Sequence, residues 1–472
     1  MIRPLAVSLS LLAIATACLA ADPPSLPESL RSTAASLRDA AMKGTRAYDL
    51  VRSLTTEVGP RPAGSEGDRR AVEWGLRTMH ELGFQNVRAE KVKVPHWEIG
   101  EGKGEITAPW PQPLTLIALG GSVGTPEGGI EAEVIEAPSV QDLEKMDPAQ
   151  VKGKIAFINK RMERRRDGSG YGETVGGRSR GAIVAGKLGA AALVIRSVGT
   201  DNNRTPHTGA MRYEDGGPRI PAAALSNPDA DILEAQLRSG KPVRFRLTLG
   251  SRHLPEAESA NVIGEIPGRE KPEEIVLLGC HLDSWHPGTG AVDDGAGCAI
   301  VMEAARHIGE LKQRPRRTIR VVLYANEEFG LSGARGYAEK YAADLAKHVL
   351  AGESDFGAGK VWSIDSGVDP AAVPLFDEIV KLVAPLGIER GTNEAGGGAD
   401  LSTLAPARVP LMDLNQDGTY YFDWHHTAND TLDKVDPKDL NQNVAAWAAV
   451  AYAAAEVSGD FGRAPERAAQ GR

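Results

Sequence analysis

From about residue 256 onward, short apolar runs alternate with amphipathic stretches, and this alternation constrains the fold more than any other feature. Strand-like runs such as EEIVLLGC and RTIRVVLYA are each followed by a helix-like segment such as GAGCAIVMEAARHIGEL. Strand–helix–strand repeats form a mainly parallel sheet with helices on both faces. Active sites of such folds lie where the strands end at their carboxyl edge. The sequence therefore predicts an α/β/α sandwich whose functional residues directly follow its strands.

The middle of the chain has a different pattern, rich in Pro, Gly and short β runs. Within it, KGKIAFI (152–158) and AAALVIRS (190–197) are predicted strands on either side of the helix RGAIVAGKLG, a βαβ-like unit. We expect this stretch to form an accessory domain inserted into the main one. The predicted organisation is a main domain at 21–105 and 256–460, an insertion at 106–255 and a disordered tail at 461–472.

The first twenty residues have the features of a secretory signal peptide. Arg3 precedes the apolar run LAVSLSLLAIA, and small residues follow at a plausible cleavage point. This run is too short to span a bilayer, and no later run reaches about 18 residues. We therefore expect a soluble mature protein, secreted or periplasmic, without a membrane span. Lipid anchoring at Cys18 is the minor alternative, because ATAC resembles a lipoprotein acylation site that lacks its usual Leu.

Charge and cysteine content exclude two further classes. The net charge of −9 argues against a nucleic-acid partner, since binding phosphates requires clustered Lys and Arg. The one basic cluster, KRMERRR at 160–166, contains Glu163 and is predicted to be a solvated loop. After cleavage only Cys280 and Cys298 remain. A disulfide between them is one alternative, but two buried free thiols are favoured. We therefore do not expect cysteine to hold the fold together.

The segment LLGCHLDSWHPGTGAVDDGAG, residues 277–297, carries the first candidate metal ligands. His281 lies at the end of an apolar strand, and the glycine-rich loop after it allows Asp293 to fold back toward that end. Imidazole and carboxylate are typical ligands of catalytic zinc, and one carboxylate can bridge two metals about 3.5–4 Å apart. Asp283 is predicted to accept the other ring N–H of His281 and so to fix its tautomer. Alone, HLDS is more typical of a polar turn, so this interpretation depends on further ligands.

Two further segments add carboxylates after predicted strands. Glu327 and Glu328 follow VVLYA, and adjacent acids in an extended chain point in different directions, so that one can bind metal while the other faces a bound water. Asp355 follows the β run HVLAGE, and Asp365 in WSIDSG is its rival, after a less distinct strand.

The last segment, YYFDWHHTANDT, offers the adjacent residues His425 and His426, of which only one should face the metals. Nitrogen and carboxylate ligands without thiolate suit zinc, and manganese or cobalt stays open. The predicted ligands of two metal ions are His281, Asp293, Glu328, Asp355 and one of His425 and His426, with Glu327 to spare.

The motifs HLDS…DDGAG, NEE.GL.G, ESD.G and HHT..DT, in this order, resemble those of the co-catalytic di-zinc aminopeptidase and carboxypeptidase family. The resemblance covers nearly all of the mature chain. It implies a zinc-exopeptidase α/β/α sandwich with an inserted protease-associated domain at about 106–255. It also implies two zinc ions, one held by His281 and Asp355, the other by Glu328 and His426, with Asp293 bridging them and Glu327 as general base.

Three other residues carry weaker expectations. His425 stands where many relatives have Tyr, and we hypothesise that it donates a hydrogen bond to the tetrahedral intermediate. Asp400, in GGGADLSTL, is equally consistent with a partner for a peptide terminus and with a turn. His207, in a polar loop of the insertion, is predicted to be an exposed histidine rather than a ligand.

The resemblance implies hydrolysis of dipeptides or short peptides with a free N-terminus. A general aminopeptidase acting on longer peptides is the alternative. A non-catalytic, receptor-like binding protein is less consistent, because every ligand position and the base are filled. A single-zinc glutaminyl cyclase is disfavoured by the insertion and by the acid pair Asp293–Asp294. Whether the protein forms a homodimer stays open.

Overall fold

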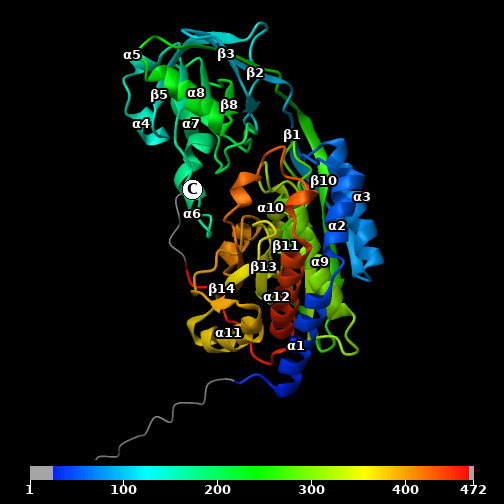
Figure 1. Ribbon diagram of the computed structural model, residues 1–472. Helices are drawn as coiled ribbons and strands as arrows, with labels where there is room; N and C mark the ends of the chain where they lie inside the picture. Colours follow the sequence, from blue (N-terminus) through cyan, green and yellow to red (C-terminus); the bar gives the residue numbers. More distant parts are fainter. Residues whose placement is uncertain (1–24, 467–472) are drawn as a thin grey trace, which may run out of the picture.

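Two eight-stranded mixed sheets organise the part of the chain that the computed structural model describes, residues 25–466 (Figure 1). The four central strands of the first sheet run parallel, and antiparallel pairs flank them. The predicted parallel arrangement is therefore confined to the centre of a mixed sheet. In pairing order, the strands are β1 (Gln85–Glu98), β10 (Arg252–Ile266), β12 (Arg317–Tyr324), β11 (Lys271–His281), β13 (His348–Glu353), β16 (Leu411–Gln416), β14 (Val361–Gly367) and β15 (Glu389–Arg390).

The central strands are buried on both faces, which explains their unbroken apolar sequences. In β11, Leu278 packs into the core that contains α9 and α12, whereas Leu277 packs into a smaller core on the opposite face, with α10. The Ala-rich α12 is almost entirely buried, because small side chains allow α1 and α9 to pack closely against it. The helices are α1 (Glu28–Lys43), α2 (Ala47–Ser53), α3 (Glu66–Glu81), α9 (Ala296–Gly309), α10 (Ser332–Lys340), α11 (Val373–Val380) and α12 (Pro437–Glu456).

The second sheet forms a separate layer beyond the ends of β1 and β10 (Figure 1). These two long antiparallel strands carry the chain from the first sheet to the second and back. The parallel run β5–β6–β7–β8 gives this unit its own βαβ character, with α7 between β6 and β7. Its strands, in pairing order, are β3 (Gln112–Leu114), β2 (Gly102–Ala108), β9 (Arg244–Leu249), β5 (Ile130–Ala137), β6 (Ile155–Ile158), β7 (Ala192–Arg196), β8 (Ala222–Leu225) and β4 (Leu116–Ala118). Its helices are α4 (Val140–Glu144), α5 (Pro148–Val151), α6 (Ser169–Thr174), α7 (Gly176–Lys187) and α8 (Asn227–Leu237).

The short turns of 3-10 or π type connect these elements. They are η1 (Leu54–Val58), η2 (Ala291–Gly295), η3 (Leu345–Lys347), η4 (Pro370–Ala372), η5 (Lys381–Leu386), η6 (Asp400–Ala407), η7 (Tyr421–Asp423) and η8 (Leu432–Lys434).

The end of the chain is more ordered than predicted. Phe461 is completely buried and contacts Phe376 of α11, with ring centroids 6.1 Å apart. The backbone N–H of Ala464 donates to the carbonyl of Arg408. The predicted start of a disordered tail at residue 461 was therefore wrong, because one aromatic side chain fixes the segment on the core. Residues 467–472 lie outside the described part.

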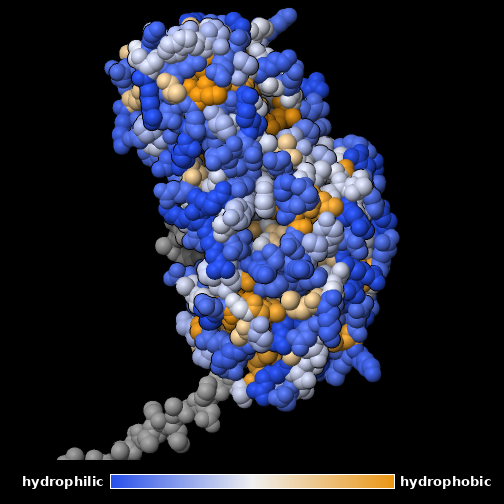
Figure 2. Space-filling model, viewed as in Figure 1, coloured by the Kyte–Doolittle hydropathy of each residue, from blue (hydrophilic) through white to orange (hydrophobic). Residues whose placement is uncertain are grey.

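The signal peptide and Cys18 also fall outside the described residues, so those predictions stay predictions. None of the described helices combines the length and the apolar character needed to cross a bilayer. The face drawn in Figure 2 is largely hydrophilic, with scattered hydrophobic patches.

Candidate metal centre

The predicted ligands meet at the carboxyl edge of the first sheet. His281 is the last residue of β11, the two glutamates follow β12, and Asp355 follows β13. Because β12, β11 and β13 are parallel neighbours, their ends lie side by side. The turn η2 contributes Asp293, and the segment after η7 contributes His425 and His426.

Asp293 lies between two histidine–carboxylate pairs. Its Oδ1 is 3.0 Å from Nε2 of His281, and its Oδ2 is 3.3 Å from Nε2 of His426. On one side, Asp355 Oδ1 lies 3.3 Å from His281 Nε2. On the other side, Glu328 Oε2 lies 2.9 Å from His426 Nε2. The carboxylate of Asp293 thus faces two separate half-sites with one oxygen each.

The charge balance of the centre suits bound cations. No Lys or Arg within residues 25–466 forms an ion pair with Asp293, Glu328 or Asp355. Asp293 Oδ2 and Glu328 Oε1 are buried without a hydrogen-bond partner, a costly state for anionic oxygens. The donors are imidazole nitrogen and carboxylate oxygen, a set that suits a divalent metal such as zinc. The residues therefore fit divalent metal in charge and in donor type.

The same imbalance shifts the pKa values of the site. Although burial opposes it, the carboxylates of Asp355, Asp283 and Asp293 raise the pKa of His281 well above its ordinary value. Burial raises the pKa of Glu327 well above its ordinary range, and the nearby carboxylates of Asp355 and Glu328 act in the same direction.

Glu327 is placed to reach a substrate in the cleft. It lines a cavity of about 460 Å³ together with Asp293, Asp355 and His425. Asn326, just before it, has a positive φ of 58°, a conformation that Asn tolerates better than most residues. This turn directs two consecutive acids into the centre, Glu328 toward His426 and Glu327 toward the cavity.

Asp283 supports the centre, but through a different atom than predicted. Nδ1 of His281 lies 3.1 Å from the backbone carbonyl of Asp283 and 3.7 Å from its side-chain Oδ1. The prediction that the carboxylate accepts the ring N–H was therefore wrong in its atom. The carboxylate instead accepts the backbone N–H of Glu327 at 3.0 Å, in the loop after β12. A carbonyl acceptor fixes the same tautomer of His281.

His425 and His426 both face the centre, contrary to the expectation that only one would. Their rings stack, with centroids 3.5 Å apart and planes at 19°. Nε2 of His425 is 3.7 Å from Asp293 Oδ2. His426 has φ 63°, and this left-handed turn brings two consecutive side chains to one side. Burial and the neighbouring His426 lower the pKa of His425 well below its ordinary value, which keeps it neutral.

The rival ligand Asp365 and the predicted terminus partner Asp400 do not join the centre. Asp365 lies within β14, where its carboxylate accepts from Thr392 Oγ1 at 3.0 Å and from Asn415 Nδ2 at 2.6 Å. Asp400 is completely buried, with no hydrogen-bond partner for either carboxylate oxygen. Its role toward a peptide terminus stays a prediction.

The sequence prediction missed two residues near the centre. Asp430 accepts the backbone N–H groups of Val292 at 2.6 Å and Asp293 at 3.2 Å, and so holds η2 in place. Asp430 is the Asp of the motif HHT..DT, so the motif could have indicated this residue. Arg178 of α7 lies 3.3 Å from Nδ1 of His426 through Nη1, and nothing local in the sequence indicates this contact.

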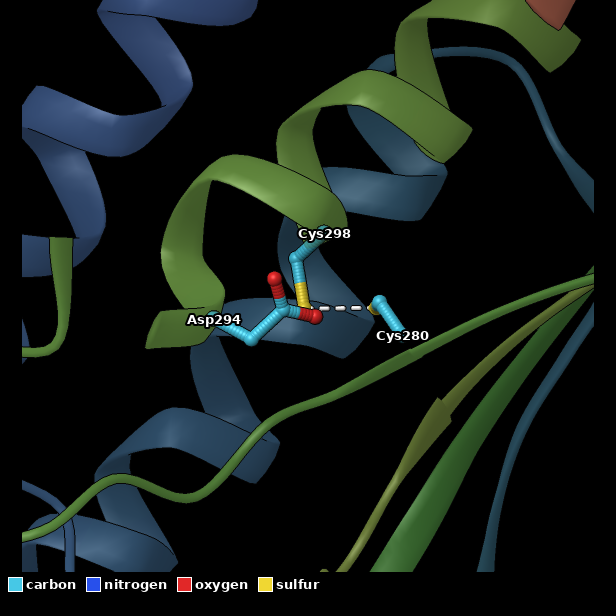
Figure 3. Close-up of side chains that lie close together, drawn as sticks. All are labelled: Cys280, Asp294 and Cys298. Carbon is cyan, nitrogen blue, oxygen red and sulfur yellow. Dashed lines mark hydrogen bonds between the residues drawn. The ribbon is translucent and has the colours of Figure 1, made fainter. Parts of the chain in front are cut away.

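A second cluster lies behind His281, formed by Cys280, Asp294 and Cys298 (Figure 3). Both cysteines are buried free thiols, as favoured from the sequence, with sulfur atoms 2.6 Å apart. The oxygens of Asp294 already accept the backbone N–H groups of His281 at 3.2 Å and Gly297 at 3.0 Å. The cluster therefore ties the end of β11 to the start of α9, beneath the metal centre.

Comparison with known proteins agrees with this geometry. Residues 261–451 match the sequence model of peptidase family M28. Carboxypeptidase Q of Mus musculus is 36% identical over 412 residues, which cover 87% of this chain and 86% of the relative. The human carboxypeptidase Q is 35% identical over the same length, with the same coverage.

Solved structures are similar over comparable lengths. A peptidase M28 precursor from Shewanella amazonensis SB2B has a TM-score of 0.92 and 49% identity, covering 93% of this chain and all of that one. A zinc aminopeptidase from Bacillus subtilis has a TM-score of 0.64 and 21% identity, over 87% of this chain and 95% of that one, which shows the shared fold.

The fold, the excess of buried acids at the centre and the similarity to known peptidases together define a metallo-exopeptidase. The prediction of such an enzyme is confirmed. The chain belongs to peptidase family M28.

Proposed function

We propose that the protein is a di-zinc exopeptidase that hydrolyses dipeptides or short peptides with a free N-terminus. One observation carries this proposal: the two oxygens of Asp293 face two opposite histidine–carboxylate pairs, at 3.0 and 3.3 Å from the histidine nitrogens. A single-metal site has no need of the second pair. The naming of one structural neighbour as a zinc aminopeptidase supports zinc as the metal.

In this proposal, Asp293 would be a ligand shared by the two ions. Bound zinc supplies Lewis-acid polarisation of the substrate carbonyl and lowers the pKa of water. The pairs that hold the ions are His281 with Asp355, and Glu328 with His426.

Glu327 acts as the general base. Its carboxylate accepts a proton from the attacking water and returns it to the leaving amine. Its place beside the cavity and the hydrogen bond from its backbone N–H to Asp283 support this role, because that bond fixes the turn that carries it. His425, held neutral by burial, keeps an N–H to donate to the oxyanion of the tetrahedral intermediate.

The size of the cleft supports a short substrate. Tyr171 and Arg178 of the second sheet's unit line the cavity of about 460 Å³ together with the residues of the centre. We propose that this unit is an inserted protease-associated domain and that it limits the length of peptide that can enter. A signal peptide at 1–20 would direct the enzyme to the periplasm or the exterior, with lipid anchoring at Cys18 as the minor alternative.

The experiment combines metal analysis with a substrate panel. Purified protein is assayed for bound zinc per chain and for hydrolysis of dipeptides, aminoacyl anilides and peptides with N-terminal Gln. We expect two zinc ions per chain and the highest kcat/KM on dipeptides. Preference for the anilides and longer peptides would favour the general aminopeptidase, release of ammonia from Gln peptides would favour a cyclase, and zinc-free inactive protein would contradict the proposal.

A further inference from the structure

The unit of the second sheet does more than cover the cleft, because it bonds directly to the segment that carries the last metal ligand. Besides His207, four of its loop residues bond to residues 417–426 of the main domain. The partners are Arg164 with Asp423, Arg166 with Asp417, Thr200 with Phe422 and Asp423, and Thr208 with His426. The basic cluster at 160–166, predicted to be a solvated loop, is thus partly occupied in this contact.

His207 lies at the centre of the contact. It is 1% exposed, so the prediction of an exposed loop histidine was wrong, because burial here depends on a segment more than two hundred residues away. Its Nδ1–H donates to the backbone carbonyl of His425 at 2.7 Å. Its Nε2 lies 2.8 Å from Asp201 Oδ1. Gly199 leaves room for this ring, since a Cβ there would come within 2.2 Å of it.

The next residue, Thr208, contacts His426 through both its backbone N–H and its backbone carbonyl. The N–H of Thr208 donates to the carbonyl of His426 at 3.1 Å. The carbonyl of Thr208 lies 3.3 Å from Nδ1 of the His426 ring. Arg178 Nη1 lies at the same distance of 3.3 Å from this nitrogen, so Thr208 and Arg178 together position the ring, with Nε2 toward Glu328 and Asp293.

We propose that this unit is a structural part of the metal centre, and that His207 is a positioning residue for the turn His425–His426. His207 acts through the carbonyl of His425, while the backbone of Thr208 sets the ring of His426. The turn needs this support, because His426 has a left-handed backbone at φ 63°, which is unfavourable for a non-glycine residue. The inference rests on the proposed zinc chemistry only for its effect on metal affinity.

Two amide variants separate the hydrogen bond from mere filling of space. The amide nitrogen of Asn corresponds to Nδ1, and that of Gln corresponds to Nε2. His207→Asn therefore keeps the donor to the His425 carbonyl, whereas His207→Gln keeps only the contact with Asp201. His207→Ala removes both. His253→Ala is the matched control, since Nε2 of His253 bonds to the carbonyl of Gly121 at 2.9 Å, away from the centre.

Zinc affinity is measured by competition with a chromophoric chelator, and backbone hydrogen exchange is measured on metal-free protein. We expect His207→Ala and His207→Gln to weaken binding of one of the two ions by about 10–100-fold and to speed exchange at residues 421–427. His207→Asn should stay within about threefold of wild type, and His253→Ala should change neither quantity.

Equal behaviour of the Asn and Gln variants would overturn the proposal, as would unchanged exchange at 421–427 in His207→Ala. The exchange experiment needs no metal, so it decides the positioning role even if wild-type protein binds no zinc. Failure of the wild type to bind zinc or to cleave peptides would instead contradict the proposed function.

Discussion

In the second sheet Glu131 lies between Arg244 and Arg246, at 3.2 and 2.7 Å, whereas Asp293 at the edge of the first sheet meets only histidines. The buried Asp229 of the second unit bonds to Arg204 at 2.7 Å, but none of the three proposed carboxylate ligands has an Arg or Lys partner within residues 25–466. Both units are α/β layers built on the same packing rules. In the second unit, arginines of the same unit neutralise these acids.

The presence or absence of cationic partners for buried acids indicates where the functional site lies. Burial of an unpaired anion is expensive, so it persists where a cation from outside compensates for it. Arginines neutralise Glu131 and Asp229 of the second unit, whereas the buried oxygens of Asp293 and Glu328 suit a cation from outside. The predictions on catalysis and metal binding each contrast a change at the metal centre with a matched change in the second unit.

The largest expected effect is on turnover in Glu327→Gln. Removing the charge of the general base should lower kcat by about a thousandfold, with zinc content unchanged, because Glu327 is not among the proposed ligands. Glu131→Gln is the matched control and should leave kcat within twofold. Steady-state kinetics with metal analysis checks both, and a Glu327→Gln enzyme that kept a tenth of its turnover would refute the assignment.

The second-largest expected effect is a loss of zinc affinity in Asp293→Asn. An amide has one acceptor oxygen, so it cannot serve both half-sites, and zinc affinity should fall by about a hundredfold or more. Asp229→Asn, in the second unit, should leave zinc affinity unchanged and lower thermal stability. Chelator competition and a melting curve measure the two effects. Loss of zinc from both variants would show that the contrast between the units is wrong.

The strands and most site residues were predictable because their signals are local. Buried parallel strands have continuous apolar sequences, and the acids that follow them, such as Glu328 and Asp355, are adjacent in the sequence. The helix α3 begins after Ser65, whose side chain accepts the N–H of Asp68 at 3.2 Å, an N-cap that residue type favours. Such short-range chemistry is decided within a few residues.

The errors concern contacts between distant segments or exact backbone direction. His207 is buried by His425, far along the chain, and Phe461 by Phe376. The joint direction of His425 and His426 depends on one positive φ, which residue type alone does not indicate. Predictions from sequence patterns assume an ordinary backbone with negative φ. Turns such as the one at His426 depart from that conformation.

A pH-dependent stability effect follows from Asp68 of the main domain, which forms no ion pair with Lys or Arg among the described residues 25–466. Burial raises the pKa of Asp68 to about 6, although Gly64 N–H and Ser259 hydroxyl bonds oppose this. A carboxyl pKa raised above its unfolded value of 3.8 stabilises the fold at low pH, and this contribution is lost as pH rises to about 6. Asp68→Asn, which has no such titration, should therefore gain on wild type by up to about 3 kcal/mol between pH 4 and 7.

Urea unfolding of both proteins at pH 4, 5, 6 and 7 measures this gain. The carboxamide retains an acceptor oxygen and a donor for the two bonds, so the difference at pH 4 serves as the baseline. A difference that stays constant across the series would show that Asp68 does not titrate in this range.

The smallest effect belongs to the paired acids of the second unit. Arg204 has 57% of its side chain exposed, while Asp229 is completely buried and also accepts from Ser226 Oγ at 2.6 Å and Thr115 N–H at 3.1 Å. Because those bonds remain, Arg204→Ala should cost about 1 kcal/mol of unfolding free energy, and added salt should reduce the loss. Arg52→Ala, which breaks an ion pair exposed on both sides, should cost less than about 0.5 kcal/mol. Chemical denaturation at low and high salt measures both variants. A loss in Arg204→Ala no larger than in Arg52→Ala would mean that burial of Asp229 is compensated by its neutral donors alone, and that the arginines of this unit do not explain why its acids tolerate burial.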